Sequence, residues 1–290
     1  MPPATVQQEE QRDIDDLATG ALVNFLGKAA RISRGGFIWV VTLLCGLEVQ
    51  ALYSLTWGFV STLNKIGRFG LQRGVVRHLT EVRTGDQKRG AEIVVAAALR
   101  VGLLVSGVVT VAMVLTAGWV EAFYGKPIAT SLRIMAFSTA FMSVAWTLGS
   151  AIRALRIMRY NVYVMSVCGP LFLLVAGSVA GLLYPTLEGI SWAQLAMTIV
   201  ICMLSAYYYQ RFYSLRNTLR FLFAATSWKP LARFSFPVMI TDLLRALLTQ
   251  LDVLMLGRFV PQNQIYLVGV YVLARRLASA VLKAPQAVDP

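Results

Sequence analysis

The sequence predicts an all-α fold, a polytopic integral membrane helix bundle of about eight transmembrane helices. Hydrophobic residues make up 57% of the 290 residues and charged residues only 14%, whereas a soluble domain carries about a quarter charged residues. The mean hydropathy is +0.63. The apolar residues are collected in runs of about 20, the length that crosses a bilayer. Lipid is therefore the solvent that fits this composition.

The apolar runs divide the chain into a polar tail, a first bundle of six helices and the start of a second bundle. The tail, residues 1–20, is acidic and lacks the features of a cleaved signal, so we expect it to stay in the cytoplasm. The first bundle is expected over 21–213, a cytoplasmic amphipathic connector over 214–230, and helices seven and eight over 231–290. The spans are predicted at 21–46, 51–74, 90–119, 131–155, 162–183, 190–209, 231–257 and from 265 onward.

Positive charge collects in alternate loops. The loops on one side hold only Lys126 and Arg258 as cations, together with Glu48, Glu121 and Glu188. Because cytoplasmic loops accumulate Lys and Arg, this alternation predicts a multi-pass protein with a cytoplasmic N-terminus. The cations assigned to the cytoplasmic side are Arg73, Arg77, Arg83, Lys88, Arg89, Arg153, Arg156, Arg159, Arg211, Arg216, Arg220, Lys229 and Arg233.

Particular residues within single segments predict how individual helices pack, bend or lie on the membrane surface. The connector mixes Arg216 and Arg220 with aromatic residues, which fits a surface-lying amphipathic helix or a plain connecting helix. The pair Gly177 and Gly181 would let a neighbouring helix approach closely. Pro170 and Pro237 fall inside spans, where each removes a backbone hydrogen bond and bends the helix. The cysteines, Cys45, Cys168 and Cys202, lie in or beside apolar runs and are interpreted as small buried hydrophobes.

Ionisable residues inside the predicted spans are the candidate functional residues. Each costs roughly 2.5–3.5 kcal/mol at the centre of a membrane helix, so such residues usually face water or a partner. The carboxylates are Asp242 and Asp252, both in span seven, where Asp242 and Arg245 are close enough to neutralise each other. The cations outnumber them and are Lys28, Arg31, Arg34, Lys65, Arg68, Arg100, Arg245, Arg275 and Arg276.

Two interpretations of these cations remain open. The cations nearest the cytoplasm, Lys28, Arg31, Lys65 and Arg68, can extend their side chains to the membrane interface. Alternatively, the cations line a hydrated cavity open toward the cytoplasm. Such a cavity would attract an anion, and guanidinium groups bind phosphate oxygens in two-pronged contacts. A diphosphate-linked glycan is a natural cargo for it.

Several segments resemble polysaccharide-biosynthesis flippases, members of the multidrug/oligosaccharidyl-lipid/polysaccharide exporter superfamily. They are GALVNFLGK at 20–28, GGF at 35–37, GRFGLQRGVVR at 67–77, LARFSFP at 231–237, DVLMLGR at 252–258 and GVYVLA at 269–274. The resemblance is diffuse and spans most of 20–290. It implies alternating access around a central cationic cavity and outward movement of an undecaprenyl-diphosphate-linked oligosaccharide for lipopolysaccharide or exopolysaccharide assembly, in the bacterial inner (plasma) membrane.

The same resemblance implies roles for the intramembrane residues. The cations Lys28, Arg31, Arg34, Lys65, Arg68, Arg100, Arg245 and Arg275 would hold the diphosphate, and Asp242 and Asp252 would take part in ion coupling. The expected partners are membrane lipid, the lipid-linked cargo and other polysaccharide assembly proteins, with no nucleic acid. Family members usually have twelve or fourteen spans, so a truncated product is one expectation for a chain with eight.

Other functions are less consistent with the residues. An enzyme is disfavoured because the only histidine, His78, lies in a basic loop and no metal, cofactor or nucleophile pattern is present. A drug or cation exporter of the same superfamily should carry acidic cavity residues, which are outnumbered here. A non-transporting membrane protein or assembly partner is the third alternative.

Overall fold

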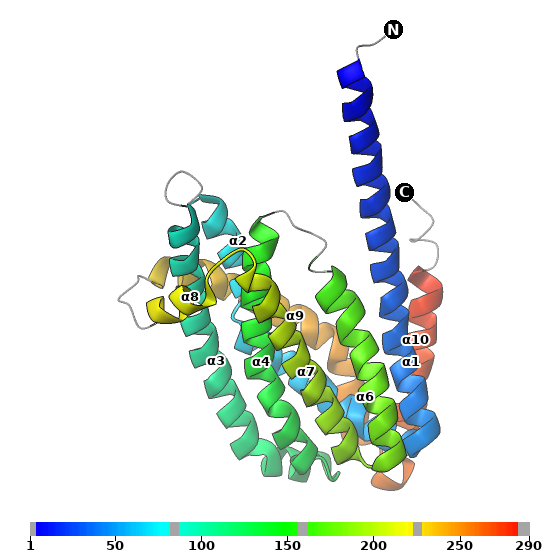
Figure 1. The fold of residues 1–290 in the computed structure, drawn as a ribbon. Helices are drawn as coiled ribbons and strands as arrows, with labels where there is room; N and C mark the ends of the chain where they lie inside the picture. Colours follow the sequence, from blue (N-terminus) through cyan, green and yellow to red (C-terminus); the bar gives the residue numbers. More distant parts are fainter. Residues whose placement is uncertain (1–3, 82–86, 156–159, 161, 223–227, 284–290) are drawn as a thin grey trace.

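The chain folds as a bundle of helices, as Figure 1 shows. The computed structural model describes the backbone of residues 4–81, 87–155, 160, 162–222 and 228–283, and side chains within these ranges from 35 to 279. No strand occurs in the described ranges. The elements in chain order are α1 (Ala4–Arg68), α2 (Leu71–Glu81), α3 (Gln87–Tyr124), α4 (Ala129–Ala154), the π-helix η2 (Val162–Cys168), α6 (Gly169–Leu183), α7 (Leu187–Gln210), α8 (Leu215–Phe221), α9 (Lys229–Phe259), the short 3₁₀ helix η3 (Gln262–Gln264) and α10 (Tyr266–Lys283).

The predicted fold class, an all-α membrane bundle, is confirmed. Among the described residues, five segments are long and apolar enough to cross a membrane. They are Gly35–Thr80, Lys88–Tyr124, Ala129–Ala154, Tyr163–Leu183 and Leu187–Gln210. The exposed side chains on the outside of α3 form an apolar stripe that includes Leu104, Val108 and Leu115, which suits contact with lipid tails.

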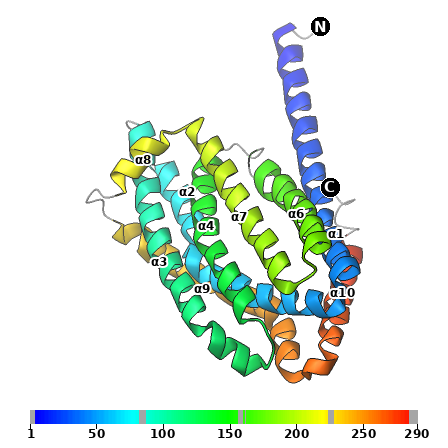
Figure 2. The ribbon, with the colours of Figure 1, turned by 60° about the horizontal axis from the view of Figure 1, so that its bottom comes forward.

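The first two predicted spans form two helical arms of α1 that meet directly at a kink, without the loop expected between them. The helix bends at Gly46, whose backbone has φ 85° and ψ 167°. This left-handed conformation is open to glycine without the steric penalty that a Cβ would bring. The bend divides α1 into a first arm, which packs on α6, and a second arm, which runs between the other helices toward α2 (Figure 2).

The second predicted span ends earlier than expected. It was predicted to reach residue 74, but α1 ends at Arg68 and a tight turn follows, with positive φ at Phe69 and Gly70. The next residues, expected in a loop, form the separate helix α2. Gly70 and Gly74 allow α2 to lie against the backbone of α9 near Ser235, because a side chain at either glycine would collide with α9.

The helices fall into two groups joined by α1. In the larger group α3 packs on α4, α4 on α7, and α7 on α6. Helices α9 and α10 form the second group and pack mainly on α1 and α2. In Figures 1 and 2, α9 lies behind the layer formed by α4 and α7.

The predicted close approach at the glycine pair is also present. The ring of Phe37 on α1 lies against Gly177 on α6, and Leu44 and Cys45 lie against Gly181. The partner of the glycine pair is therefore the first arm of α1. Of the two prolines predicted inside spans, Pro170 lies in the first turn of α6, and Pro237 lies inside α9.

One end of the bundle carries most of the described cations. Helices α2 and α8, the start of α3 and the end of α4 all lie at this end in Figure 1. Arg73, Arg77, Lys88, Arg153 and Arg216 belong to these elements. We call this the cationic end. The α3–α4 turn, the α6–α7 turn and η3 lie at the opposite end.

Candidate functional site

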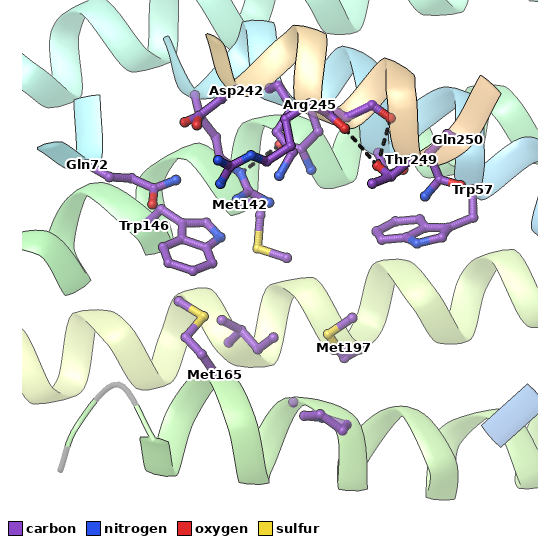
Figure 3. A pocket seen from close by; sticks show the side chains of 18 of the residues that line it. Trp57, Gln72, Met142, Trp146, Met165, Met197, Asp242, Arg245, Thr249 and Gln250 are labelled. Carbon is purple, nitrogen blue, oxygen red and sulfur yellow. Dashed lines mark hydrogen bonds between the residues drawn. The ribbon is translucent and has the colours of Figure 1, made fainter. Parts of the chain in front are cut away.

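A cavity of about 600 Å³ lies between the two groups of helices (Figure 3). Its walls come from the second arm of α1, α2, α9 and α10 on one side, and from α4, η2, α6 and α7 on the other. This volume lies within the range of small-molecule sites, about 300–1,000 Å³.

The wall formed by α1, α2, α9 and α10 is polar, and we call it the polar face. It carries one carboxylate, Asp242, among the described lining residues. Cations outnumber this carboxylate, and uncharged hydrogen-bonding groups lie between them. The cations are Lys65, Arg68, Arg73, Arg245 and Arg276, and the uncharged groups are Ser61, Asn64, Gln72, Thr249 and Gln250.

Helical periodicity explains how these residues reach one wall. On α1, Ser61, Lys65 and Arg68 follow one another at spacings of four and three, which is one face of a helix. On α9, Asp242, Arg245 and Thr249 follow at spacings of three and four. The sequence predicted both stripes, and the structure brings them to the same cavity.

Arg68 is held by contacts on two sides. Its Nε donates a hydrogen bond to Oδ1 of Asn64 at 3.2 Å. The guanidinium carbon lies 4.8 Å from the centre of the Trp146 ring, a cation–π distance. Arg153 approaches the same ring at 5.4 Å. The aromatic ring therefore holds the Arg68 guanidinium in the cavity lining and also contacts Arg153, which lies outside the lining.

Asp242 pairs with Arg73, not with Arg245. Nη2 of Arg73 lies 3.4 Å from Oδ1 of Asp242, and the two side chains are 58% and 28% exposed. This weak ion pair joins α2 to α9 within the polar face. The expected neutralisation of Asp242 by Arg245 is wrong, because α2 brings a guanidinium to the carboxylate from another helix.

A second cavity of about 250 Å³ shares Trp57, Leu173, Gln250 and Arg276 with the first. Arg275 lines this second cavity. Its Nη1 lies 2.8 Å from both carboxylate oxygens of Asp252.

The Arg275–Asp252 pair is supported by its neighbours. Tyr271 donates a hydrogen bond to the Asp252 carboxylate at 2.7 Å, and Nη2 of Arg275 donates to the carbonyl of Thr249. Asp252 is thus engaged in holding α9 to α10.

The predicted site residues therefore lie in different places. Lys65, Arg68, Arg245 and Asp242 line the main cavity, whereas Arg275 and Asp252 pair beside the smaller one. The side chains of Lys28, Arg31 and Arg34 lie outside the described residues.

Arg100 does not line either cavity. It is exposed on α3, one turn before Leu104 on the outward apolar stripe. The prediction that Arg100 belongs to the cavity depended on depth alone, and the rotation of α3 about its axis turns this residue outward.

Two groups of lining residues were not selected from the sequence. Arg73 was assigned to a loop, although the neighbouring Gln72 belonged to the predicted polar stripe. The second group is the wall of α4, η2, α6 and α7, which we call the apolar wall. Its residues are Met142, Trp146, Met165, Gly169, Pro170, Leu173, Met197 and Ile201. These residues resemble those of any buried membrane helix, so only tertiary structure distinguishes them.

The end of the bundle opposite the cationic end is closed by a buried lysine. Lys126, in the α3–α4 turn, is 3% exposed. Its Nζ donates hydrogen bonds to the carbonyls of Gly257 and Val260 at the end of α9, the second at 2.9 Å. Burial and the neighbouring Arg258 lower the pKa of Lys126 below its ordinary value.

The described residues contain no group of three His, Cys, Asp or Glu side chains that would hold a metal ion. His78, whose Nδ1 donates a hydrogen bond to the carbonyl of Gly74, lies on α2 outside both cavities. The cations of the polar face give the main cavity groups that can recognise a negatively charged ligand.

Comparison with known proteins finds a matching family and a solved structure of similar fold. The family described as "Polysaccharide biosynthesis protein" matches residues 19–284. No curated protein matches the chain. A solved structure titled as the inward-facing conformation of a multidrug resistance MATE family transporter of the MOP superfamily is similar in fold. It shares 18% sequence identity with a TM-score of 0.53, and the alignment covers 90% of this chain and 71% of that one.

Proposed function

Because the chain belongs to the polysaccharide biosynthesis protein family and has the fold of a membrane transporter, we propose that it is a flippase for a lipid-linked oligosaccharide. The cargo would be an undecaprenyl-diphosphate-linked glycan moved outward across the bacterial inner membrane. Membrane lipid and other polysaccharide assembly proteins would be its partners. The observation that carries the proposal is the excess of cations over carboxylates on the polar face.

The polar face suits a diphosphate group. Guanidinium groups offer paired N–H donors that match phosphate oxygens, and they keep their charge at any physiological pH. Lys65, Arg68 and Arg245 come from two helices, so they approach a bound group from different directions. The apolar wall across the cavity lowers the local dielectric constant and strengthens the attraction.

Alternating access is supported by the difference between the two ends. At the opposite end Lys126 is buried against α9, whereas near the cationic end the Arg73–Asp242 pair is long and partly exposed. If the cationic end faces the cytoplasm, as the positive-inside rule implies, cargo would enter from the cytoplasm. Asp242 is then the candidate for ion coupling, since Asp252 is engaged with Arg275.

A drug or cation exporter of the same superfamily is the rival. Its cargo would need a negative cavity, but the described lining has one carboxylate against the cations of the polar face. The multidrug label belongs to the structurally similar transporter, whose identity to this chain is only 18%.

The test measures surface glycan in cells whose glycan export depends on this gene. Arg68→Gln and Arg245→Gln each remove a lining cation and keep hydrogen-bonding capacity, so we expect surface glycan to fall at least tenfold while the protein still inserts. Arg216→Gln on α8 is the matched control, because Arg216 is exposed and lies outside the cavity. Export at the normal level in both cavity variants would contradict the proposal.

A further inference from the structure

The lining of the main cavity separates by helix. Every charged lining residue comes from α1, α2, α9 or α10, and the described lining from α4, η2, α6 and α7 carries no charge. In Figure 3, Met165 and Met197 lie across the cavity from Asp242 and Arg245, with Met142 and Trp146 between them. The cavity is therefore two-sided, with an ionic face opposite an apolar one.

The apolar wall is unsuited to sugar hydroxyls. Apart from the indole N–H of Trp146, its side chains offer no strong donor or acceptor. A glycan pressed against it would lose hydrogen bonds with water and gain none, which is unfavourable. The polar face, by contrast, supplies Asn64, Gln72, Thr249 and Gln250, whose side chains can serve hydroxyl groups.

The apolar wall is suited to a flexible hydrocarbon. Methionine side chains are unbranched and polarisable, so they adapt to ligands of irregular shape. Three of them line this wall, and Met142 and Met197 are 7% and 2% exposed. The smaller cavity adds Phe37, Ile38, Val253 and Val272 beside the shared residues Trp57 and Leu173. The same cavity also has polar and charged residues in its lining, so support for a hydrocarbon site comes from the apolar wall of the main cavity. These residues are Tyr53, Ser54, Gln250, Ser279, Arg275 and Arg276.

We propose that the cavity holds the phosphates of its cargo together with the adjoining hydrocarbon, the phosphates on the polar face and the first branched hydrocarbon units against Met142, Met165 and Met197. This inference rests on the proposed function and deepens it. The ligand class is a prenyl diphosphate in which the hydrocarbon contributes to binding inside the protein as well as in the surrounding lipid.

The experiment compares two ligands that share the diphosphate and differ in the hydrocarbon. The purified full chain in lipid nanodiscs is titrated with inorganic pyrophosphate and with geranyl diphosphate by calorimetry. We expect geranyl diphosphate to bind at least tenfold more tightly, because its hydrocarbon would be removed from water against apolar side chains. Equal affinity for the two ligands would overturn the inference.

Variants then locate the hydrocarbon. Met165→Gln with Met197→Gln should weaken geranyl diphosphate about tenfold and leave pyrophosphate unchanged, whereas the matched pair Met165→Leu with Met197→Leu should keep both affinities. Thermal unfolding of each variant checks that the fold persists. An unchanged ratio of the two affinities in the glutamine variant would also overturn the inference.

A separate variant distinguishes this inference from the proposed function. Arg245→Gln should weaken both ligands by a similar factor, because the diphosphate is common to them. If Arg245→Gln and Arg68→Gln leave pyrophosphate binding intact, the phosphate site itself is wrong and the proposed function fails with it. If the arginine variants lose pyrophosphate binding but the unmodified protein shows no preference for geranyl diphosphate, only the proposed hydrocarbon site is wrong.

Discussion

The ammonium group of Lys126 donates a hydrogen bond to the carbonyl oxygen of Val260 at 2.9 Å, joining the α3–α4 turn to the end of α9. A helix leaves its last carbonyls without intrahelical partners, and its C-terminus carries partial negative charge. A buried cation satisfies both features without a carboxylate. The contact therefore fastens the two groups of helices to each other at the end opposite the cationic end.

Replacing Lys126 should open this end. Lys126→Met keeps the apolar stem and removes the donor, so the end carbonyls of α9 lose their partner, at a cost of about 1–3 kcal/mol. A cysteine at Gln250, which lines both cavities, should then react faster with a membrane-impermeant thiol reagent added outside intact cells. Met→Leu at the exposed Met203 is the control. Equal labelling rates with and without Lys126 would refute the closing role.

The lowered pKa of Lys126 predicts the direction in which the stability of the protein changes with pH. In the unfolded chain the amine keeps its proton to higher pH, so between the two pKa values the unfolded state binds more protons and stability rises with pH. The thermal midpoint of the protein, relative to that of Lys126→Met, should therefore increase as the pH approaches the ordinary lysine pKa of about 10.4. If the thermal midpoint of the protein, relative to that of Lys126→Met, decreased as the pH rose, the lowered pKa would be contradicted.

Removing the carboxylate at Asp242 should affect ligands more than folding. Its ion pair with Arg73 is long and partly exposed, and such pairs contribute about 0.2–1 kcal/mol. Asp242→Asn removes the negative charge from the described lining, so pyrophosphate should bind more tightly, and any dependence of transport on proton or sodium gradients should change. Calorimetry and gradient-driven transport assays measure the two effects; if neither changes, Asp242 has no coupling role.

The Arg275–Asp252 pair should be more important for stability. Both side chains are 34% exposed, the N–O distances are 2.8 Å, and Tyr271 adds a hydrogen bond. Asp252→Asn, Arg275→Gln and the double variant form a cycle whose coupling free energy we expect at about 1 kcal/mol or more. Thermal unfolding in one detergent supplies the values. Additive losses would show that the two groups act independently.

Packing of α1 on α6 depends on the absence of a side chain at Gly177. A Cβ there would overlap the ring of Phe37, which is 1% exposed and packs edge to face on Tyr53. Gly177→Ala should destabilise the protein by about 1–3 kcal/mol. Gly118→Ala on α3 is the matched control because a Cβ there meets no atom within 4 Å. Equal thermal midpoints in the two variants would contradict the close contact.

The sequence specified the helices better than their connections. Bilayer thickness fixes the length of an apolar run, so the predicted spans coincide closely with α3, α4, α7 and α9. Gly46 was predicted to end the first span, and its non-helical φ and ψ confirm a break at this residue. The loop expected after it is absent, because the second arm of α1 begins directly at the kink. The turn at Phe69 was not foreseen because its positive φ belongs to a residue type that rarely adopts it.

The candidate site was predictable where several residues share one helix face. Lys65 and Arg68 belonged to a stripe with helical spacing, and both line the cavity. Arg100 had no such stripe, so its depth was known while its direction was not. The methionine wall could not be foreseen, since no local pattern separates a methionine facing a cavity from one facing a neighbouring helix.

The bend at Gly46 has a consequence for motion. The second arm of α1 runs from this residue to Arg68, a length of about 33 Å at 1.5 Å per residue. A rotation of about 10° at the glycine would move the far tip by about 6 Å over this length. A small change in two backbone torsions at this single α-carbon would therefore be enough to displace the guanidinium group of Arg68 by several ångströms.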